Sequence, residues 1–190
     1  MSAIDKKYQE SCKLILDECT EMLSRIDCSQ TEQFIDLLCG ARRVFFIGVG
    51  RVMLSLEAMA KRLAHLGIQT HVVGDINEPS FGVEDLLVVA SGSGESIVPV
   101  AIAKKAKSIG GKIVHIGSNP TGTVAQLADL QVRIPAQTKL ALPDEFQSNQ
   151  AMTSLFEQTL LLYGDAVAAV IIDAKGLDIH ALWDTHANLE

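Results

Sequence analysis

Hydrophobic positions recur with two different periods along the chain, and the change comes near residue 40. Residues 4–26 carry apolar or cysteine side chains at helical spacing with charged residues between them, which predicts an amphipathic helix. A second, shorter helix is expected next, because Ser29 and Glu32 have the spacing of a capping box ahead of an apolar stretch. The first 40 residues are therefore expected to be helical.

From residue 43 onwards, short apolar runs alternate with helical patterns. The runs cover residues 44–47, 70–73, 86–90, 113–116 and 130–134, and the helical patterns cover residues 52–66, 97–109, 121–127 and 149–172. This alternation is typical of βαβ crossovers and a five-stranded parallel sheet. We expect one domain over residues 1–190, with N-terminal helices at 1–40, a core at 43–172 and a C-terminal helix or tail at 173–190.

Composition and charge narrow the class of protein. Of the 190 residues, 48% are hydrophobic and only 5% aromatic, which favours a parallel sheet covered by helices over an all-β or nucleic-acid-stacking fold. The net charge of −7 opposes binding to nucleic acid or an anionic membrane. An anion, if one is bound, therefore requires a local site.

Location and cysteine usage point to an ordinary intracellular chain. No apolar run reaches the roughly 18 residues of a spanning helix, and the polar start does not resemble a secretory signal, so a cytoplasmic location is expected. The four cysteines, Cys12, Cys19, Cys28 and Cys39, lack metal-ligand spacing. We interpret them as packed thiols and expect no metal site.

The loop after the third predicted strand has the strongest chemical signal. In a doubly wound sheet, ligands bind beyond the carboxyl ends of the strands, where the strand order reverses. With a flavodoxin-like order 2-1-3-4-5, residues 48–51 and 91–96 would line one crevice. In the second loop glycines free backbone amides, Ser91, Ser93 and Ser96 add hydroxyls, and a helix begins, which together suit a phosphate. A flexible turn that only caps the helix is the alternative, and Glu95 would repel a phosphate unless it turns outward or caps the helix.

The first loop is less specific. Gly48 and Gly50 lack the third glycine of the dinucleotide fingerprint, although Asp75 could bind a ribose, so a nicotinamide cofactor stays an alternative. Arg51 would supply bidentate donors to the same anion, or it is a solvated arginine at a helix start.

Two residues are candidates for acid and base chemistry. Glu157 lies among apolar residues of the closing helix, where a partly buried carboxylate would suit a general base, although an exposed helical glutamate is the commoner case. His186 lies in a C-terminal segment of the kind that usually frays, and His65 is expected to be a packed histidine at a helix end.

Seven segments together resemble the sugar isomerase (SIS) fold and, within it, the 6-phospho-3-hexuloisomerase family. The serine-glycine loop marks the broad class, whereas the segments around residues 138, 157 and 186 narrow it. The matching segments are residues 47–51, 61–67, 73–75, 91–96, 134–139, 154–158 and 186–190.

The resemblance implies a fold, an activity and a set of roles. The fold is a three-layer αβα sandwich. Members interconvert D-arabino-hex-3-ulose 6-phosphate and fructose 6-phosphate in the ribulose monophosphate route of formaldehyde fixation, without metal or redox cofactor. Glu157 would be the catalytic base, and His186 would reach a site shared between subunits of a homotetramer. The phosphate-binding residues would be Gly50, Arg51, Ser91, Gly92, Ser93 and Ser96.

The chain departs from the family pattern in the first loop, ahead of Glu157 and beside His186, at Val52, Met53, Ala151, Thr153 and Thr185. The family usually has Ser and Gly at the first pair, Pro and Gly at the second, and Arg at the last. An arabinose 5-phosphate-type isomerase, a non-catalytic phosphosugar sensor and an NAD-dependent oxidoreductase remain alternative functions.

Overall fold

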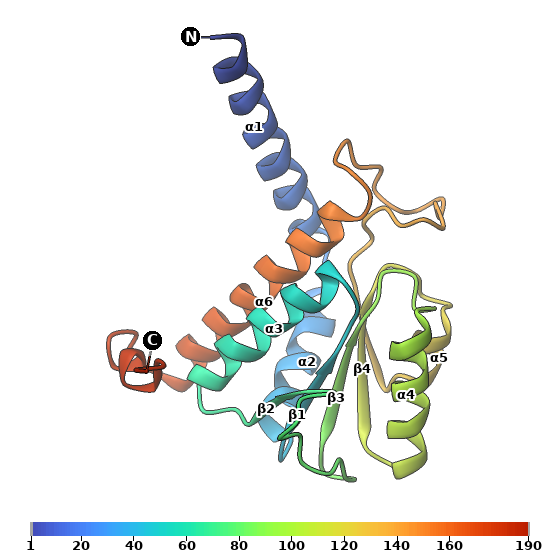
Figure 1. Ribbon diagram of the computed structural model, residues 1–190, viewed down its shortest axis with the longest axis vertical. Coiled ribbons are helices and arrows are strands. Elements are labelled where there is room, and N and C mark those ends of the chain that lie inside the picture. The colour runs from blue at the N-terminus through green and yellow to red at the C-terminus, as the bar shows by residue number, and fades with distance from the viewer. Residues whose placement is uncertain (1, 190) are drawn as a thin grey trace.

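Five parallel strands form the central sheet in the order β2-β1-β3-β4-β5 (Figure 1). The strand order reverses between β1 and β3, so it is the predicted flavodoxin-like order. The computed structural model describes residues 2–189. In chain order the elements are α1 (Ala3–Ser24), α2 (Cys28–Gly40), β1 (Val44–Ile47), α3 (Arg51–His65), β2 (Thr70–Val72), β3 (Leu86–Ala90), α4 (Ile97–Ile109), β4 (Lys112–Gly117), α5 (Thr123–Leu127), β5 (Leu130–Arg133), α6 (Ser154–Lys175) and the 3-10 helix η1 (Ala181–Thr185).

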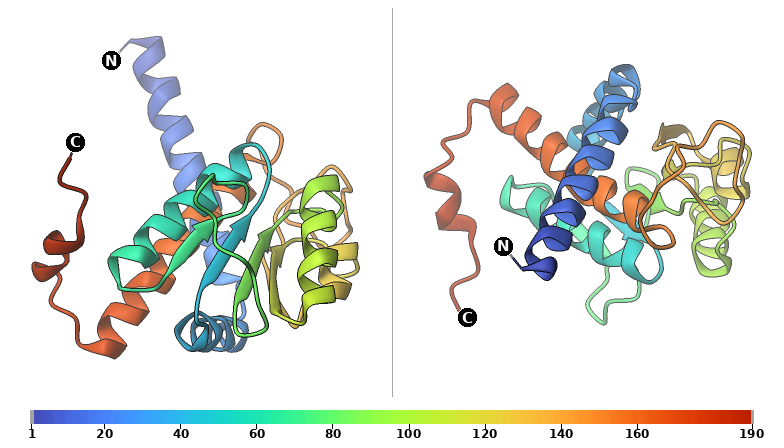
Figure 2. Two further views of the ribbon diagram at one scale, coloured as in Figure 1. Left: turned by 60° about the horizontal axis from the view of Figure 1, so that its bottom comes forward. Right: turned by 90° about the horizontal axis from the view of Figure 1, so that it is seen from above.

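Helices cover both faces of the sheet, which confirms the three-layer αβα sandwich. The helices α2, α3 and α6 pack on one face, and α4 and α5 pack on the other (Figures 1 and 2). Successive residues of a strand point to opposite faces, so Phe46 and Val88 enter the first core while Phe45 and Leu87 enter the second. Strands β1 and β3 are buried along their whole length, which accounts for their uninterrupted apolar sequences.

Helix α1 extends away from the rest of the chain (Figure 1). Its buried residues Glu18, Cys19 and Met22 all lie in its last two turns, whereas Ile4 and Tyr8 near its start are exposed. The helix is therefore attached to the domain only through its C-terminal part.

Three predicted helix starts are wrong. In each case an Asp, Asn or Glu side chain accepts hydrogen bonds from residues at the predicted start. Helix α2 is capped by Asp27, whose carboxylate accepts from the Ser29 N–H at 2.7 Å, so Ser29 is not the cap. Helix α5 starts two residues late, since Asn119 Oδ1 accepts from the Thr121 N–H and hydroxyl. Helix α6 starts at Ser154 rather than at residue 149, because residues 148–150 bind the Glu18 carboxylate instead.

Helix α6 is apolar on most of its surface because it lies in the core. Among residues 2–189 it is the one helix long and apolar enough to cross a membrane by length and composition, contrary to the sequence expectation, and 56% of that stretch is buried. Its Gly164 lies against Met59 of α3, and a Cβ at this glycine would come within 2.9 Å of the Met59 side chain. A helix buried on most sides needs few polar positions, which explains its composition.

Asp85 anchors the start of β3 with a fully buried carboxylate. It accepts hydrogen bonds from Arg42, Arg43 and the Gly82 N–H at 2.8–3.3 Å. Burial alone would raise the pKa of Asp85, but these bonds outweigh it and lower the pKa to about 2. A lowered pKa stabilises the fold at all pH values above the ordinary aspartate range, and that stabilisation is lost as pH falls towards 2.

We expect Asp85→Asn to lower the free energy of unfolding at pH 7 by about 2–3 kcal/mol, because two arginines lose a buried counter-charge. Urea unfolding measures the change. Asp144→Asn is the matched control, since Asp144 also pairs with an arginine but its side chain is 57% exposed, so a much smaller change is expected there. Equal effects in the two variants would contradict the anchoring role of Asp85.

Candidate functional site

The serine-glycine loop joins the end of β3 to the start of α4 and presents hydroxyl donors. Ser91 Oγ accepts from the Gly94 N–H at 3.1 Å and Ser93 Oγ accepts from the Glu95 N–H at 3.3 Å, which leaves their hydroxyl hydrogens for other acceptors. Ser96 Oγ lies 3.3 Å from Ser91 Oγ and makes no cap bond to α4, although Ser96 is its N-cap. The first amides of α4 and these hydroxyls together suit an anion.

Glycine is required within this loop. Gly94 has φ +69°, and a Cβ there would lie 3.3 Å from Gly122 Cα. Glu95, whose charge would oppose a phosphate, turns outward and accepts from the Thr123 N–H and hydroxyl at 2.7 and 2.8 Å. The backbone bond from Thr123, followed by the side-chain bond, lowers the pKa of Glu95. Its negative charge therefore serves the start of α5.

His115, on the neighbouring strand β4, forms a hydrogen bond with the backbone of the serine-glycine loop. It is fully buried on β4, and its Nε2 lies 3.0 Å from the Ser91 carbonyl oxygen. A carbonyl can only accept, so Nε2 carries the proton. Burial lowers the pKa of His115 to about 4 despite the opposing effect of the bond to Ser91, so the ring is neutral at pH 7. A neutral ring keeps positive charge out of this buried layer.

A cavity of about 560 Å³ is lined by the loop and by three other segments, residues 49–52, 137–139 and 152–157. Ligand cavities of this size accommodate a small phosphorylated molecule. All but one of the predicted site residues line it, namely Gly50, Arg51, Ser91, Gly92, Ser93, Ser96 and Glu157. Residues that the sequence argument did not assign to the site are Val49, Val52, Ala90, Gln137, Thr138, Lys139, Met152, Thr153 and Phe156.

Glu157 lies in the first turn of α6 and is only 8% exposed. Its Oε2 accepts from Arg51 Nε at 2.5 Å and its Oε1 accepts from the Thr153 hydroxyl at 2.8 Å. Ser55 of α3 donates to the Glu157 carbonyl at 2.8 Å, which fixes the turn that carries the carboxylate. The alternative of an exposed glutamate is therefore wrong, and Arg51, although its side chain is 67% exposed, is paired with this carboxylate.

The segment after β5 contributes the part of the site that was not predicted. Its buried Glu145 accepts from the Thr138 N–H and hydroxyl and from the Ser118 hydroxyl at 2.7–3.0 Å. This holds Gln137, Thr138 and Lys139 at the cavity, and Lys139 has no ion-pair partner within residues 2–189. The available signal was the short polar run at residues 137–139, which lies a few residues after a strand that ends at the same sheet edge as β1 and β3.

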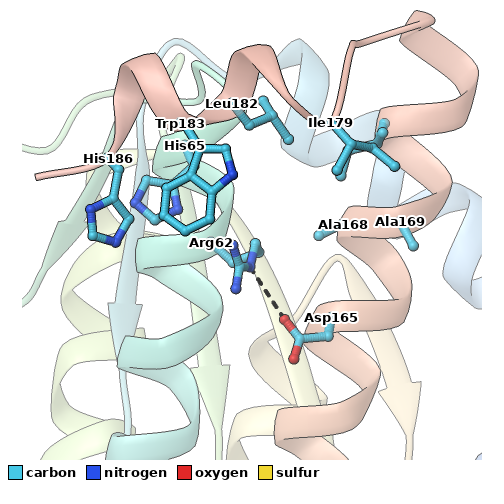
Figure 3. Close-up of a pocket in the computed structure, with 10 residues that line it drawn as sticks. Arg62, His65, Asp165, Ala168, Ala169, Ile179, Leu182, Trp183 and His186 are labelled. Atoms are coloured by element: carbon cyan, nitrogen blue, oxygen red, sulfur yellow. Dashed lines mark ion pairs between the residues drawn. The ribbon is translucent and has the colours of Figure 1, made fainter.

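His186 is the predicted site residue that this chain does not bring to the cavity. Its ring lies beside the rings of His65 and Trp183 (Figure 3). The centroid distances are 5.7 Å to His65 and 5.4 Å to Trp183. His65 ends α3 and Arg51 begins it, so the two helix ends are about 21 Å apart at 1.5 Å per residue. Participation of His186 in a site of another subunit stays a prediction.

The fold and site thus define an α/β protein with a serine-rich loop at the switch point of its sheet. The SIS domain matches residues 37–169, more than two thirds of the chain, and the chain belongs to this family. It is 37% identical to the 3-hexulose-6-phosphate isomerase of Bacillus subtilis, over 97% of this chain and 100% of the relative. It is 38% identical to that of Mycobacterium gastri, over 93% and 88%.

A solved structure supports the same relationship. The chain superposes with a TM-score of 0.81 on a Methanococcus jannaschii protein for which a 3-hexulose-6-phosphate isomerase function was inferred. The two are 31% identical, and the match covers 95% of this chain and 99% of the other.

We expect His115→Gln to flatten the pH dependence of stability between pH 7 and 4.5. Because the pKa of His115 is lowered to about 4, the unfolded chain takes up a proton near pH 6.5 that the folded chain refuses, so wild-type stability falls as pH falls. The glutamine keeps a donor for Ser91 but does not titrate. Urea unfolding should show that the variant loses about 2 kcal/mol less than wild type over this range. An equal loss in both proteins would contradict the assignment.

Proposed function

We propose that this chain is a phosphosugar isomerase that interconverts D-arabino-hex-3-ulose 6-phosphate and fructose 6-phosphate. The observation that carries the proposal is that one cavity holds a buried carboxylate, Glu157, together with the three serine hydroxyls at the start of α4. The relationship to 3-hexulose-6-phosphate isomerases supports this substrate. A non-catalytic sensor would not require a buried carboxylate directed at the same cavity.

The roles follow from the chemistry of the groups. The hydroxyls of Ser91, Ser93 and Ser96 and the first amides of α4 bind the phosphate. Glu157 removes the proton from C2 of the 3-ketose, which gives a 2,3-enediol, and returns it to C3. The proton on O2 must move to O3, and Lys139 stabilises negative charge that develops on either oxygen.

The 3-ketose reaches the site in open-chain form. Its furanose ring would need O6, which carries the phosphate, so ring opening is required only when fructose 6-phosphate is the substrate. In the proposed homotetramer, His186 of one subunit relays the proton between O2 and O3 in the site of its neighbour.

Glu157→Gln is expected to lower kcat by about 10³-fold or more and to change KM by less than about threefold, because the amide cannot accept the carbon-bound proton. The assay follows fructose 6-phosphate, with the 3-ketose made in situ from formaldehyde and ribulose 5-phosphate by the partner synthase. Glu84→Gln is the matched control, since that side chain is 73% exposed and distant from the cavity. Wild-type protein that forms no fructose 6-phosphate would overturn the proposed function, and near-normal kcat in Glu157→Gln would remove Glu157 from it.

Ser96→Ala is expected to raise KM by about 10-fold with little change in kcat, because one hydrogen bond to a charged phosphate is lost. Ser96 makes no cap bond to α4, so the helix should be unaffected. Ser108→Ala, near the other end of α4 where the hydroxyl bonds only the Lys105 carbonyl, serves as control. An unchanged KM in Ser96→Ala would place the phosphate elsewhere.

A related isomerase acting on arabinose 5-phosphate would use the same serine loop. Measuring kcat/KM on both sugars with one preparation decides between them. A higher value for arabinose 5-phosphate would assign the chain to that reaction.

A further inference from the structure

The Glu157 carboxylate is held by two side chains, one on each oxygen. Arg51 donates to Oε2 and Thr153 donates to Oε1. The two donors come from different elements, Arg51 from the start of α3 and Thr153 from the residue before α6. The carboxylate is therefore oriented as well as buried.

The Thr153 hydroxyl does not cap helix α6, although threonine at an N-cap position usually does so. Thr153 is the N-cap of α6, where threonine normally accepts a hydrogen bond from an amide of the first turn and so stabilises the helix. Here the side chain makes no cap bond and donates to the carboxylate four residues later. A favourable helix interaction is given up for a contact with Glu157.

The backbone around Thr153 is constrained in a way that supports this contact. Met152 has φ +55°, a left-handed conformation that is unfavourable for a non-glycine residue, although its side chain is 86% exposed and packs against little. Two residues earlier, Gln150 is tied to the buried carboxylate of Glu18 at 3.0 Å. The turn that presents Thr153 is therefore strained at one residue and anchored beside it.

The two donors differ in how firmly they can hold the carboxylate. The Arg51 side chain is 67% exposed and long, and the proposed function gives it a competing acceptor, the dianionic phosphate of the substrate. Thr153 is half-buried and short, and it has no such competitor. When Arg51 turns to the phosphate, the bond from Thr153 to Oε1 remains.

We propose that Thr153 is a positioning residue that keeps the Glu157 carboxylate directed at the substrate carbon once Arg51 engages the phosphate. The inference rests on the proposed function, in which Glu157 is the base. A base must lie within hydrogen-bond distance and correctly aligned to remove a carbon-bound proton, so loss of this orientation lowers the rate of the chemical step rather than substrate binding.

The test compares Thr153→Val, which keeps the side-chain shape but removes the donor, with Thr153→Ser, which keeps the donor. We expect Thr153→Val to lower kcat by about 10- to 100-fold with KM within about threefold of wild type. Thr153→Ser should restore kcat to within about threefold, because its hydroxyl can reach Oε1. Thermal unfolding confirms that both variants are folded. A kcat in Thr153→Val within about twofold of wild type, or an equal loss in Thr153→Ser, would overturn the proposal.

A second readout does not depend on turnover. The ¹³C-carboxyl NMR signal of Glu157, assigned by its loss in Glu157→Gln, can be compared at one pH in wild type and both variants. Its chemical shift depends on the hydrogen bonds that the carboxylate accepts, so the signal should move in Thr153→Val and stay in place in Thr153→Ser. Equal chemical shifts in all three proteins would overturn the proposal. If wild type forms no fructose 6-phosphate, the proposed function fails, and this comparison still decides whether Thr153 holds the carboxylate.

Discussion

The close packing of α6 on α3 is the contact on which the site depends. Gly164 allows α6 to approach the side chain of Met59, and at the other end of the contact Ser55 bonds the Glu157 carbonyl. This packing places the first turn of α6 beside the first residue of α3, so that Glu157 and Arg51 meet although they are 106 residues apart. A larger residue at position 164 would separate the helices and with them the two charged groups.

Buried carboxylates hold the long segment between β5 and α6, which has little secondary structure of its own. Glu145, which belongs to this segment, accepts a hydrogen bond from Thr138 in its first half. Glu18 of α1 accepts hydrogen bonds from three residues in its second half, Ser148, Asn149 and Gln150. Burial would raise the pKa of Glu18, but the bonds from Ser148, Asn149 and Gln150 outweigh it and lower the pKa. Fully hydrogen-bonded buried carboxylates give a loop a unique conformation, which a site built partly on a loop requires.

The serine loop depends on neighbouring strands as well as on its own glycines. The Ser91 carbonyl accepts a hydrogen bond from His115 Nε2, and the amides of Ser118 and Asn119 both donate to the Gly92 carbonyl. Its backbone is therefore bonded to the layer beneath, while the hydroxyls of Ser91 and Ser93 remain able to donate. These donors are therefore preorganised, a property that would make a few neutral donors effective for an anion in a protein with a net charge of −7.

The parallel sheet, its strands and the serine-glycine loop could be predicted from the sequence. The patterns that indicate them, which are short apolar runs and glycine-containing turns ahead of helices, each extend over only a few neighbouring residues. Three features depend on contacts between elements that are distant in the sequence or on the folded backbone. They are the late start of α6, the position of Lys139 at the cavity and the hydrogen bond from Thr153 to Glu157. The sequence also could not show that His186 lies at the far end of α3 in its own chain. The late start of α6 depends on hydrogen bonds between residues 130 to 132 positions apart, and such pairings follow from the packing of whole elements rather than from any local pattern.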